Sequence, residues 1–338
     1  MWKSGFKWMF LIIGTTIGAG YASGRELWEF FGHGSGLAIT LFVIFFIVSL
    51  YVIMSISYEK ATTEYRPVLK DIVGVKLSKI YDVMIFFYLY TTTVVMMSGS
   101  GATGQAFNLP YWWGVAFIAI MLFILFLKDI SGLLVINQFI LPILIVGLLY
   151  VLLTFIVDQN LHLFAHWREQ HNWTAAFPFT ALNILPLIAV LGAVGDKINS
   201  KGEIWVASIG SGLILGVVTY IYNNSLIQIA EEILVFEIPL FAILSNYPFH
   251  MVLFMTVLLW FAIFTTAASG VLGLTTRVAG YFNIPFWLLV IIILATMIPL
   301  TTLGFSTLVS VLYPLYGLLN LYVLTRLLLF PLWYKTDK

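Results

Sequence analysis

The stretch that decides the fold lies near the N-terminus, within the apolar segment 6–31, and reads Gly14-Thr15-Thr16-Ile17-Gly18-Ala19-Gly20-Tyr21-Ala22-Ser23-Gly24. Each of its four glycines lowers helix stability by about 1 kcal/mol relative to alanine, which predicts an unwound stretch. Unwinding a helix within the membrane leaves backbone N–H and C=O groups without hydrogen-bond partners, so it is tolerated only beside a cavity, a ligand or an ion. The alternative is close helix packing through small residues, such as Gly14 with Gly18.

The composition of the chain excludes a water-soluble protein. Of its 338 residues, 61% are hydrophobic and 9% are charged, whereas a soluble domain is about half apolar and about a quarter charged. The sequence has no cysteine, which excludes disulfides and thiolate chemistry, and its net charge of +1 offers no basic field for nucleic acid. We therefore expect a single transmembrane domain over residues 1–338, embedded in a lipid bilayer.

Apolar windows of about 19 residues predict an all-α, polytopic fold of ten transmembrane helices, at 6–31, 36–61, 80–106, 110–128, 133–157, 175–196, 203–225, 249–275, 284–300 and 305–333. If the N-terminus is cytoplasmic, 14 of the 16 lysines and arginines lie in inner segments, and only Arg25 and Arg168 lie outside. By the positive-inside rule, this distribution predicts that both termini face the cytoplasm.

A second irregular stretch interrupts the sixth predicted span. Asn183-Ile184-Leu185-Pro186 is followed by Gly192 and Gly195, and proline removes a backbone donor, so we expect a break or kink near Leu182 or Asn183. The sixth span comes five spans after the first, so the two hold equivalent positions if the chain consists of two five-helix halves. Broken helices at matching positions predict a transporter site between two inverted five-helix repeats, 1–157 and 175–333.

The third element is Phe264-Thr265-Thr266-Ala267-Ala268-Ser269-Gly270, in the eighth predicted span. Threonine hydroxyls in membrane helices usually bond back to a carbonyl one turn earlier, and that is the plain interpretation. The alternative is that Thr265, Thr266 and the carbonyl of Ala262 join carbonyls of the unwound first span in a cage of oxygen atoms. Such hard, uncharged ligands suit a small alkali cation.

With these three elements, the chain resembles the LeuT-fold transporters of the amino acid, polyamine and organocation superfamily. Through the stretch from Gly14 to Glu26, it looks most like the YkvI-type bacterial membrane proteins. The resemblance implies a bacterial plasma-membrane carrier with a sodium site formed by Gly14, Ile17, Ala262, Thr265 and Thr266. It also implies that the backbones of the first and sixth spans hold the solute, at Thr16, Gly18, Ala19, Gly20, Tyr21, Asn183, Ile184 and Pro186.

Two departures from the family pattern bear on the coupling ion. Some proton-coupled relatives place a lysine in the fifth span, whereas 133–157 contains no cation, which favours sodium over protons. Some relatives build a second sodium site with an asparagine shortly after the glycines of the first span. This chain has Tyr21 there, so that second site is not expected.

Three ionisable residues near the expected membrane interior are gate candidates, because buried charges are costly and usually functional. Arg25 and Glu26 follow the unwound stretch, and an outer gate would pair them with each other, with Asp158 or with Glu231 and Glu232. The alternative is an ordinary ion pair at the membrane interface. Asp196 would pair with Lys197 or Lys201 at an inner gate.

The function expected from the sequence is secondary active transport. The solute would be small, an amino acid or a related amine, moved with Na⁺ by alternating access. The alternatives are a nutrient-sensing subunit of the same fold, similar to germinant receptors, and a proton-coupled transporter. An enzyme is not expected, because the chain has no H-E-x-x-H motif and no nucleotide-binding loop, and no cofactor other than the coupling ion is expected.

Overall fold

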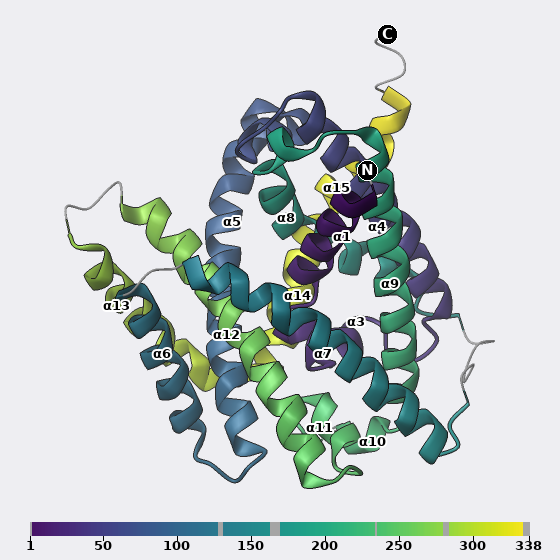
Figure 1. Ribbon diagram of the computed structural model, residues 1–338, viewed down its shortest axis with the longest axis vertical. Helices are drawn as coiled ribbons and strands as arrows, with labels where there is room; N and C mark the ends of the chain where they lie inside the picture. Colours follow the sequence, from purple (N-terminus) through teal and green to yellow (C-terminus); the bar gives the residue numbers. More distant parts are fainter. Residues whose placement is uncertain (1, 128–130, 163–169, 234, 280–283, 334–338) are drawn as a thin grey trace.

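The computed structural model describes residues 2–127, 131–162, 170–233, 235–279 and 284–333 (Figure 1). Within these ranges the chain is helical and contains no β-strand. Four of the cations used to predict the orientation lie outside the described residues: Lys128, Arg168, Lys335 and Lys338. The all-α prediction is confirmed.

The first half of the chain forms seven α-helices: α1 (Trp2–Thr16), α2 (Ala19–Ala22), α3 (Arg25–Phe30), α4 (Gly36–Glu59), α5 (Arg66–Gln105), α6 (Tyr111–Leu127) and α7 (Ser131–Asp158). The second half forms η1 (Trp173–Ala175), α8 (Ala176–Gly192), η2 (Gly195–Lys197), α9 (Lys201–Ile227), α10 (Ala230–Ile233), α11 (Pro239–Leu244), α12 (Phe249–Ala279), α13 (Phe286–Met297), η3 (Ile298–Leu303), α14 (Phe305–Leu319) and α15 (Leu321–Trp333). The η elements are short 3₁₀ helices.

Seven helices of the described chain are long and apolar enough to cross a membrane. The pair α14 and α15, bent by 41°, would make an eighth. The predicted spans at 6–31 and 110–128 correspond to shorter helices, because the first is divided into α1, α2 and α3 and the second, α6, has 17 residues. Large apolar side chains such as Trp113 and Val146 are exposed on the outer surface, as expected for contact with lipid.

Two groups of helices surround the N-terminal segment (Figure 1). On one side α1 packs along α9, and α4 packs against both α9 and α8. On the other side α5 packs against α12 and α6, and α13 contacts α6 at the edge of the molecule. The short helix α2 contacts α12, and α3 contacts α14 and α9. The interrupted N-terminal helix therefore lies between the two groups.

The predicted break at Asn183 to Pro186 is wrong, because α8 runs as one helix from Ala176 to Gly192 with Pro186 inside it. Proline removes a single amide donor, and burial against α4 and α14 on either side holds the backbone helical. The interruption comes later, between Gly192 and η2.

Gly192 and Gly195 allow the close approach of another segment at this later interruption. A Cβ atom on Gly192 would lie 2.6 Å from the Cα of Tyr65, and one on Gly195 would lie 2.6 Å from Thr62 Oγ1. The connection between α4 and α5 is therefore packed directly onto the end of α8. Larger residues at these two positions would push that connection away.

The first part of α5 precedes the third predicted span and is set off from the rest of the helix by a kink. Residues 66–73 are joined to the long helix through Gly74, whose φ of 83° and ψ of 166° make a sharp kink that only glycine adopts readily. Val68, Leu69, Ile72 and Val73 are buried, whereas Lys70 is exposed. This short segment is therefore amphipathic.

Candidate functional site

The first site element is the interruption between α1 and α2, at Ile17 and Gly18. The Gly18 amide donates to the Thr16 carbonyl at 2.9 Å, and the helical pattern resumes when the Ala22 amide donates to the Gly18 carbonyl. Among the hydrogen bonds of the described residues, none uses the carbonyl of Gly14 or Ile17 as an acceptor. These two carbonyls are the ones assigned to a cation by the resemblance, so the helix break leaves them available for such a ligand.

The second element, on α12, meets the interruption at Thr266. A Cβ atom on Gly18 would lie 3.8 Å from Thr266 Oγ1, so this hydroxyl faces the unwound backbone. The Thr265 hydroxyl donates to the Ala262 carbonyl at 3.3 Å. This is the plain interpretation of the sequence, in which a threonine hydroxyl bonds back to a carbonyl one turn earlier. Of the five expected sodium ligands, Thr265 and Ala262 are thus joined by a hydrogen bond. A Cβ on Gly14 would meet Leu141 of α7.

The third element is Glu26, which is 5% exposed at the start of α3. The side-chain amide of Asn183 on α8 donates to Glu26 Oε1 at 3.2 Å and to the Phe179 carbonyl at 2.9 Å. The other carboxylate oxygen lies beside Gly20, where a Cβ atom would be 3.0 Å away. Glu26 therefore joins two residues assigned to solute binding, Gly20 and Asn183.

The other expected solute-site residues occupy buried positions with defined partners. The Thr16 hydroxyl donates to the Ile12 carbonyl at 3.0 Å. The phenol of Tyr21 is fully buried and hydrogen-bonds Thr219 on α9 at 2.7 Å, so only its backbone remains for a ligand. Ala19 and Ile184 are buried, and Pro186 is half-buried.

The structure does not show the pairing of Arg25 with Glu26 that was one of the expected outer-gate contacts. Arg25 does not pair with Glu26; its Nη2 lies 3.9 Å from Glu29 Oε2 on the same helix. Arg25 and Glu29 lie one turn apart on α3, whereas Glu26 points toward Asn183 of α8. The chain around this pair is covered by α11, whose Leu240 amide donates to the Ser23 carbonyl at 2.9 Å.

Among the described residues, no ion pair joins Asp196 to Lys197 or Lys201, its expected inner-gate partners. Asp196 is exposed in η2, and its backbone amide donates to the Thr62 carbonyl at 3.1 Å. Lys201, one of its two expected partners, lies 3.8 Å from Glu59 of α4 instead. The backbone of this turn is held by the connection between α4 and α5, and the Asp196 side chain is left exposed.

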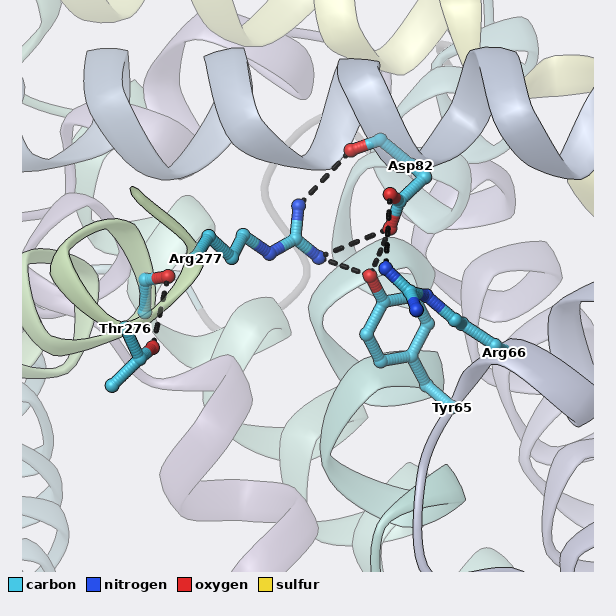
Figure 2. Close-up of polar contacts among 6 residues, drawn as sticks. Tyr65, Arg66, Asp82, Thr276 and Arg277 are labelled. Atoms are coloured by element: carbon cyan, nitrogen blue, oxygen red, sulfur yellow. Dashed lines mark hydrogen bonds and ion pairs between the residues drawn. The ribbon is translucent and has the colours of Figure 1, made fainter. Parts of the chain in front are cut away.

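A polar cluster that sequence reasoning missed joins this connection to α5 and α12 (Figure 2). Asp82 accepts a hydrogen bond from the phenol of Tyr65, and Arg277 Nη2 lies 3.3 Å from the same carboxylate. Arg277 also donates to the Asp82 carbonyl at 3.0 Å and to the Tyr65 oxygen. Arg66 Nη2 completes the cluster at 3.6 Å from Asp82 Oδ2.

The sequence contained a weak signal for this cluster. Tyr65 precedes α5, Asp82 lies on α5 and Arg277 is in the last turn of α12, so 212 residues separate the two ends. An acidic residue near the start of a membrane helix and a cation near the end of another are both ordinary interfacial residues. Only the packing of α5 against α12 makes them neighbours.

Replacing Asp82 with asparagine should lower the free energy of unfolding by about 1–2 kcal/mol, between the values typical of exposed and of buried ion pairs. Two arginines and a phenol would lose the negative charge that they share, because asparagine keeps only one acceptor oxygen and is neutral. Thermal unfolding of the purified protein measures the change. The matched control is Asp71→Asn, which removes a single ion pair, with Lys60 at 2.5 Å, and should change stability by less than about 1 kcal/mol. Equal effects of the two variants would contradict a structural role for the Asp82 cluster.

The same cluster predicts a pH dependence. Burial and the hydrogen bond to Asp82 raise the pKa of Tyr65 to about 12, from about 10 in an unfolded chain. A raised pKa means that the folded state holds the proton more tightly, so this contribution to stability is complete below about pH 10 and is lost as the pH rises through about 12.

The difference in unfolding temperature between the protein and its Tyr65→Phe variant, measured across this range, checks the prediction. The difference should shrink as the phenol ionises. A constant difference through the whole range would show that Tyr65 does not titrate with folding.

Known proteins resemble this chain in sequence and in fold. No family model matches the chain. The chain is 48% identical to the uncharacterized protein YyaD of Bacillus subtilis (strain 168) over 332 residues, which span 98% of both chains. The chain belongs to the YyaD family. A second relative of the YyaD-family chain, the uncharacterized membrane protein YkvI of the same organism, is 24% identical over 329 residues and 94% of both chains.

Solved structures identify the fold of the YyaD-family chain. The inward-facing conformation of Mhp1 matches with a TM-score of 0.68 and 11% identity, over 94% of this chain and 73% of that one. A manganese transporter of Eremococcus coleocola matches with a TM-score of 0.60 and 12% identity, over 93% and 75%. Mhp1 is described as a nucleobase-cation-symport-1 family transporter.

These likenesses confirm the resemblance to LeuT-fold transporters, and the chain is a multi-pass membrane protein. Its solved neighbours are transporters rather than enzymes.

Proposed function

We propose that the chain is a secondary active transporter that moves a small solute by alternating access. The observation that carries this proposal is the interruption between α1 and α2, which meets Thr266 of α12 on one side and the Glu26–Asn183 contact on the other. A helix broken at its centre, with free carbonyls facing a neighbouring helix, is typical of ion and solute sites in such carriers. The transporter fold supports the same conclusion.

The proposed topology is ten spans in two inverted repeats, 1–157 and 175–333, with both termini in the cytoplasm. Two features support it. Every predicted apolar window contains a helix, and α14 with α15 bends by 41° in the manner of one broken span. The distribution of lysine and arginine supports the orientation.

The proposed coupling ion is Na⁺, held by the carbonyls of Gly14, Ile17 and Ala262 and the hydroxyls of Thr265 and Thr266. The free carbonyls at the helix break and the position of Thr266 support this ligand set. Uncharged oxygen donors suit an alkali cation better than a transition metal. Sodium bound there would link α1 and α2 to α12 and stabilise one state of the cycle.

The proposed solute is an amino acid or a related amine, bound where Gly20, Glu26 and Asn183 come together. A thermal-shift screen of amino acids and amines, with and without sodium, tests this proposal, because a ligand of the folded state raises its apparent stability. At least one compound should raise the unfolding temperature more in sodium than in potassium. No shift with any amino acid or amine would contradict the proposed solute class.

A further inference from the structure

Glu26 is a buried carboxyl group that forms no ion pair with another described residue of the chain. It lies at 5% exposure between α2, α8 and α14. Its neighbours are the side-chain amide of Asn183, at 3.2 Å, and the backbone of Gly20. Neither neighbour carries a charge, so an ionised Glu26 would be stabilised by a single neutral donor.

The titratable groups around Glu26 come from four elements. Tyr88 on α5 and Tyr313 on α14 both interact electrostatically with its carboxyl group, and Tyr21 on α2 does so as well. Tyr222 on α9 packs against Gly24, two residues before Glu26. All four are phenols. Neither α8 nor α11 contributes a charged group to this contact within their described sequences.

Among the described residues, the cation next to Glu26 in sequence is Arg25, and it is engaged by other carboxylates. Its guanidinium lies 3.9 Å from Glu29 and also interacts electrostatically with Glu237. Glu237 in turn accepts a hydrogen bond from the Phe305 amide at 2.9 Å, which fixes it near the start of α14. Among the residues that the structure describes, no ion pair involves Glu26.

A buried carboxylate without a cation is strongly disfavoured, and such a group takes up a proton or another positive ligand instead. We infer that Glu26 binds a proton in this arrangement, making it a proton site of the carrier that is distinct from the sodium cage. This inference deepens the proposed transport function, on which its role in coupling rests. The carboxyl oxygen gains the proton from water, and no other bond is made or broken.

The position of Glu26 explains how the proton would be coupled to the transport cycle. The Asn183 contact holds α3 against α8, and Gly20 and Tyr313 close over the other carboxyl oxygen. When α3 separates from α8, water reaches the carboxyl group and stabilises its ionised form, so the proton leaves. Closure and proton binding therefore favour one another.

Infrared spectroscopy of the full-length protein in lipid nanodiscs tests the proton site directly. A protonated carboxylic acid gives a carbonyl stretching band that a carboxylate lacks. An ordinary exposed glutamate is ionised at neutral pH, so a buried acid band there identifies an unusual carboxyl group. We expect this band in the wild-type protein and its loss in Glu26→Gln. The matched control, Glu29→Gln, changes a carboxylate on the same helix and should keep the band.

A further variant shows whether the loss of the band in Glu26→Gln comes from misfolding. Glu26→Asp retains a carboxyl group and should keep a shifted acid band, and thermal unfolding reports whether each variant is folded. A wild-type spectrum without an acid band from mildly acidic to neutral pH, or a band unchanged in folded Glu26→Gln, would overturn the proposal. No solute or sodium is needed for this measurement. Failure of transport with the acid band intact would therefore reject the carrier function and leave the proton site standing.

Discussion

Replacing Thr266 with alanine is expected to weaken sodium binding by about 10- to 100-fold, since a polar contact to a charged group contributes about 1.5–3 kcal/mol. The hydroxyl faces Gly18 at the helix interruption, and alanine would leave a gap where a ligand is proposed. Thr265→Ala should have a similar effect, and Thr266→Ser should retain most of the affinity. The rise in unfolding temperature with sodium concentration, compared with potassium, measures the apparent affinity.

Thr275 provides the matched control on the same helix. It is fully buried and its hydroxyl donates to the Val271 carbonyl at 2.7 Å, so Thr275→Ala removes an ordinary backbone-bonded hydroxyl. Its sodium response should equal that of the wild-type protein. If Thr265→Ala and Thr266→Ala also respond to sodium like the wild type, the proposed cage is wrong.

Replacing Gly24 with alanine is expected to lower the free energy of unfolding by about 2–5 kcal/mol, which combines left-handed backbone strain with overpacking. Gly24 has φ of 79° between α2 and α3. A Cβ atom there would lie 2.6 Å from the Tyr222 hydroxyl and 2.7 Å from the ring carbon that bears it. That phenol donates to the Ala22 carbonyl, so it cannot move aside without losing a buried hydrogen bond.

A Gly32→Ala variant separates the backbone strain expected at Gly24 from the overpacking expected there. Gly32 has a φ of 49°, and the nearest atom to an added Cβ is the Trp28 carbonyl oxygen at 3.7 Å, so Gly32→Ala introduces strain without a clash. It should cost about 1–2 kcal/mol. In a Tyr222→Phe background, the Gly24→Ala cost should fall, because the closest clashing atom is gone. Chemical or thermal unfolding of the four variants measures these differences, and equal costs at Gly24 and Gly32 would contradict the packing described here.

Composition and local pattern were enough to predict the helical membrane fold and the interruption near Gly18. Apolar length decides whether a segment is a membrane helix, and a cluster of glycines weakens a helix wherever it lies. The same local logic failed at Pro186. There the cost of one lost hydrogen bond was smaller than the stabilisation from packing α8 between α4 and α14, and packing cannot be read from the helix's own sequence.

The partners of charged residues were the least predictable part of the site. Glu26 was expected at an outer gate because it follows the unwound stretch, yet the turn into α3 directs it toward Asn183, 157 residues away. Likewise, Asp82 meets Arg277 only because α5 and α12 pack together. Pairings across such distances in sequence depend on how helices are arranged, and single residues carry no signal for them.

The most direct test of the transport function is solute accumulation in proteoliposomes that contain the full-length chain. A radiolabelled mixture of amino acids and amines is supplied outside, with an inward sodium gradient or with equal sodium on both sides. We predict that at least one compound accumulates above its outside concentration only when the gradient is present, and that Thr266→Ala abolishes the accumulation. Saturable binding to the purified protein with no accumulation under any gradient would contradict the account and indicate a sensor of the same fold.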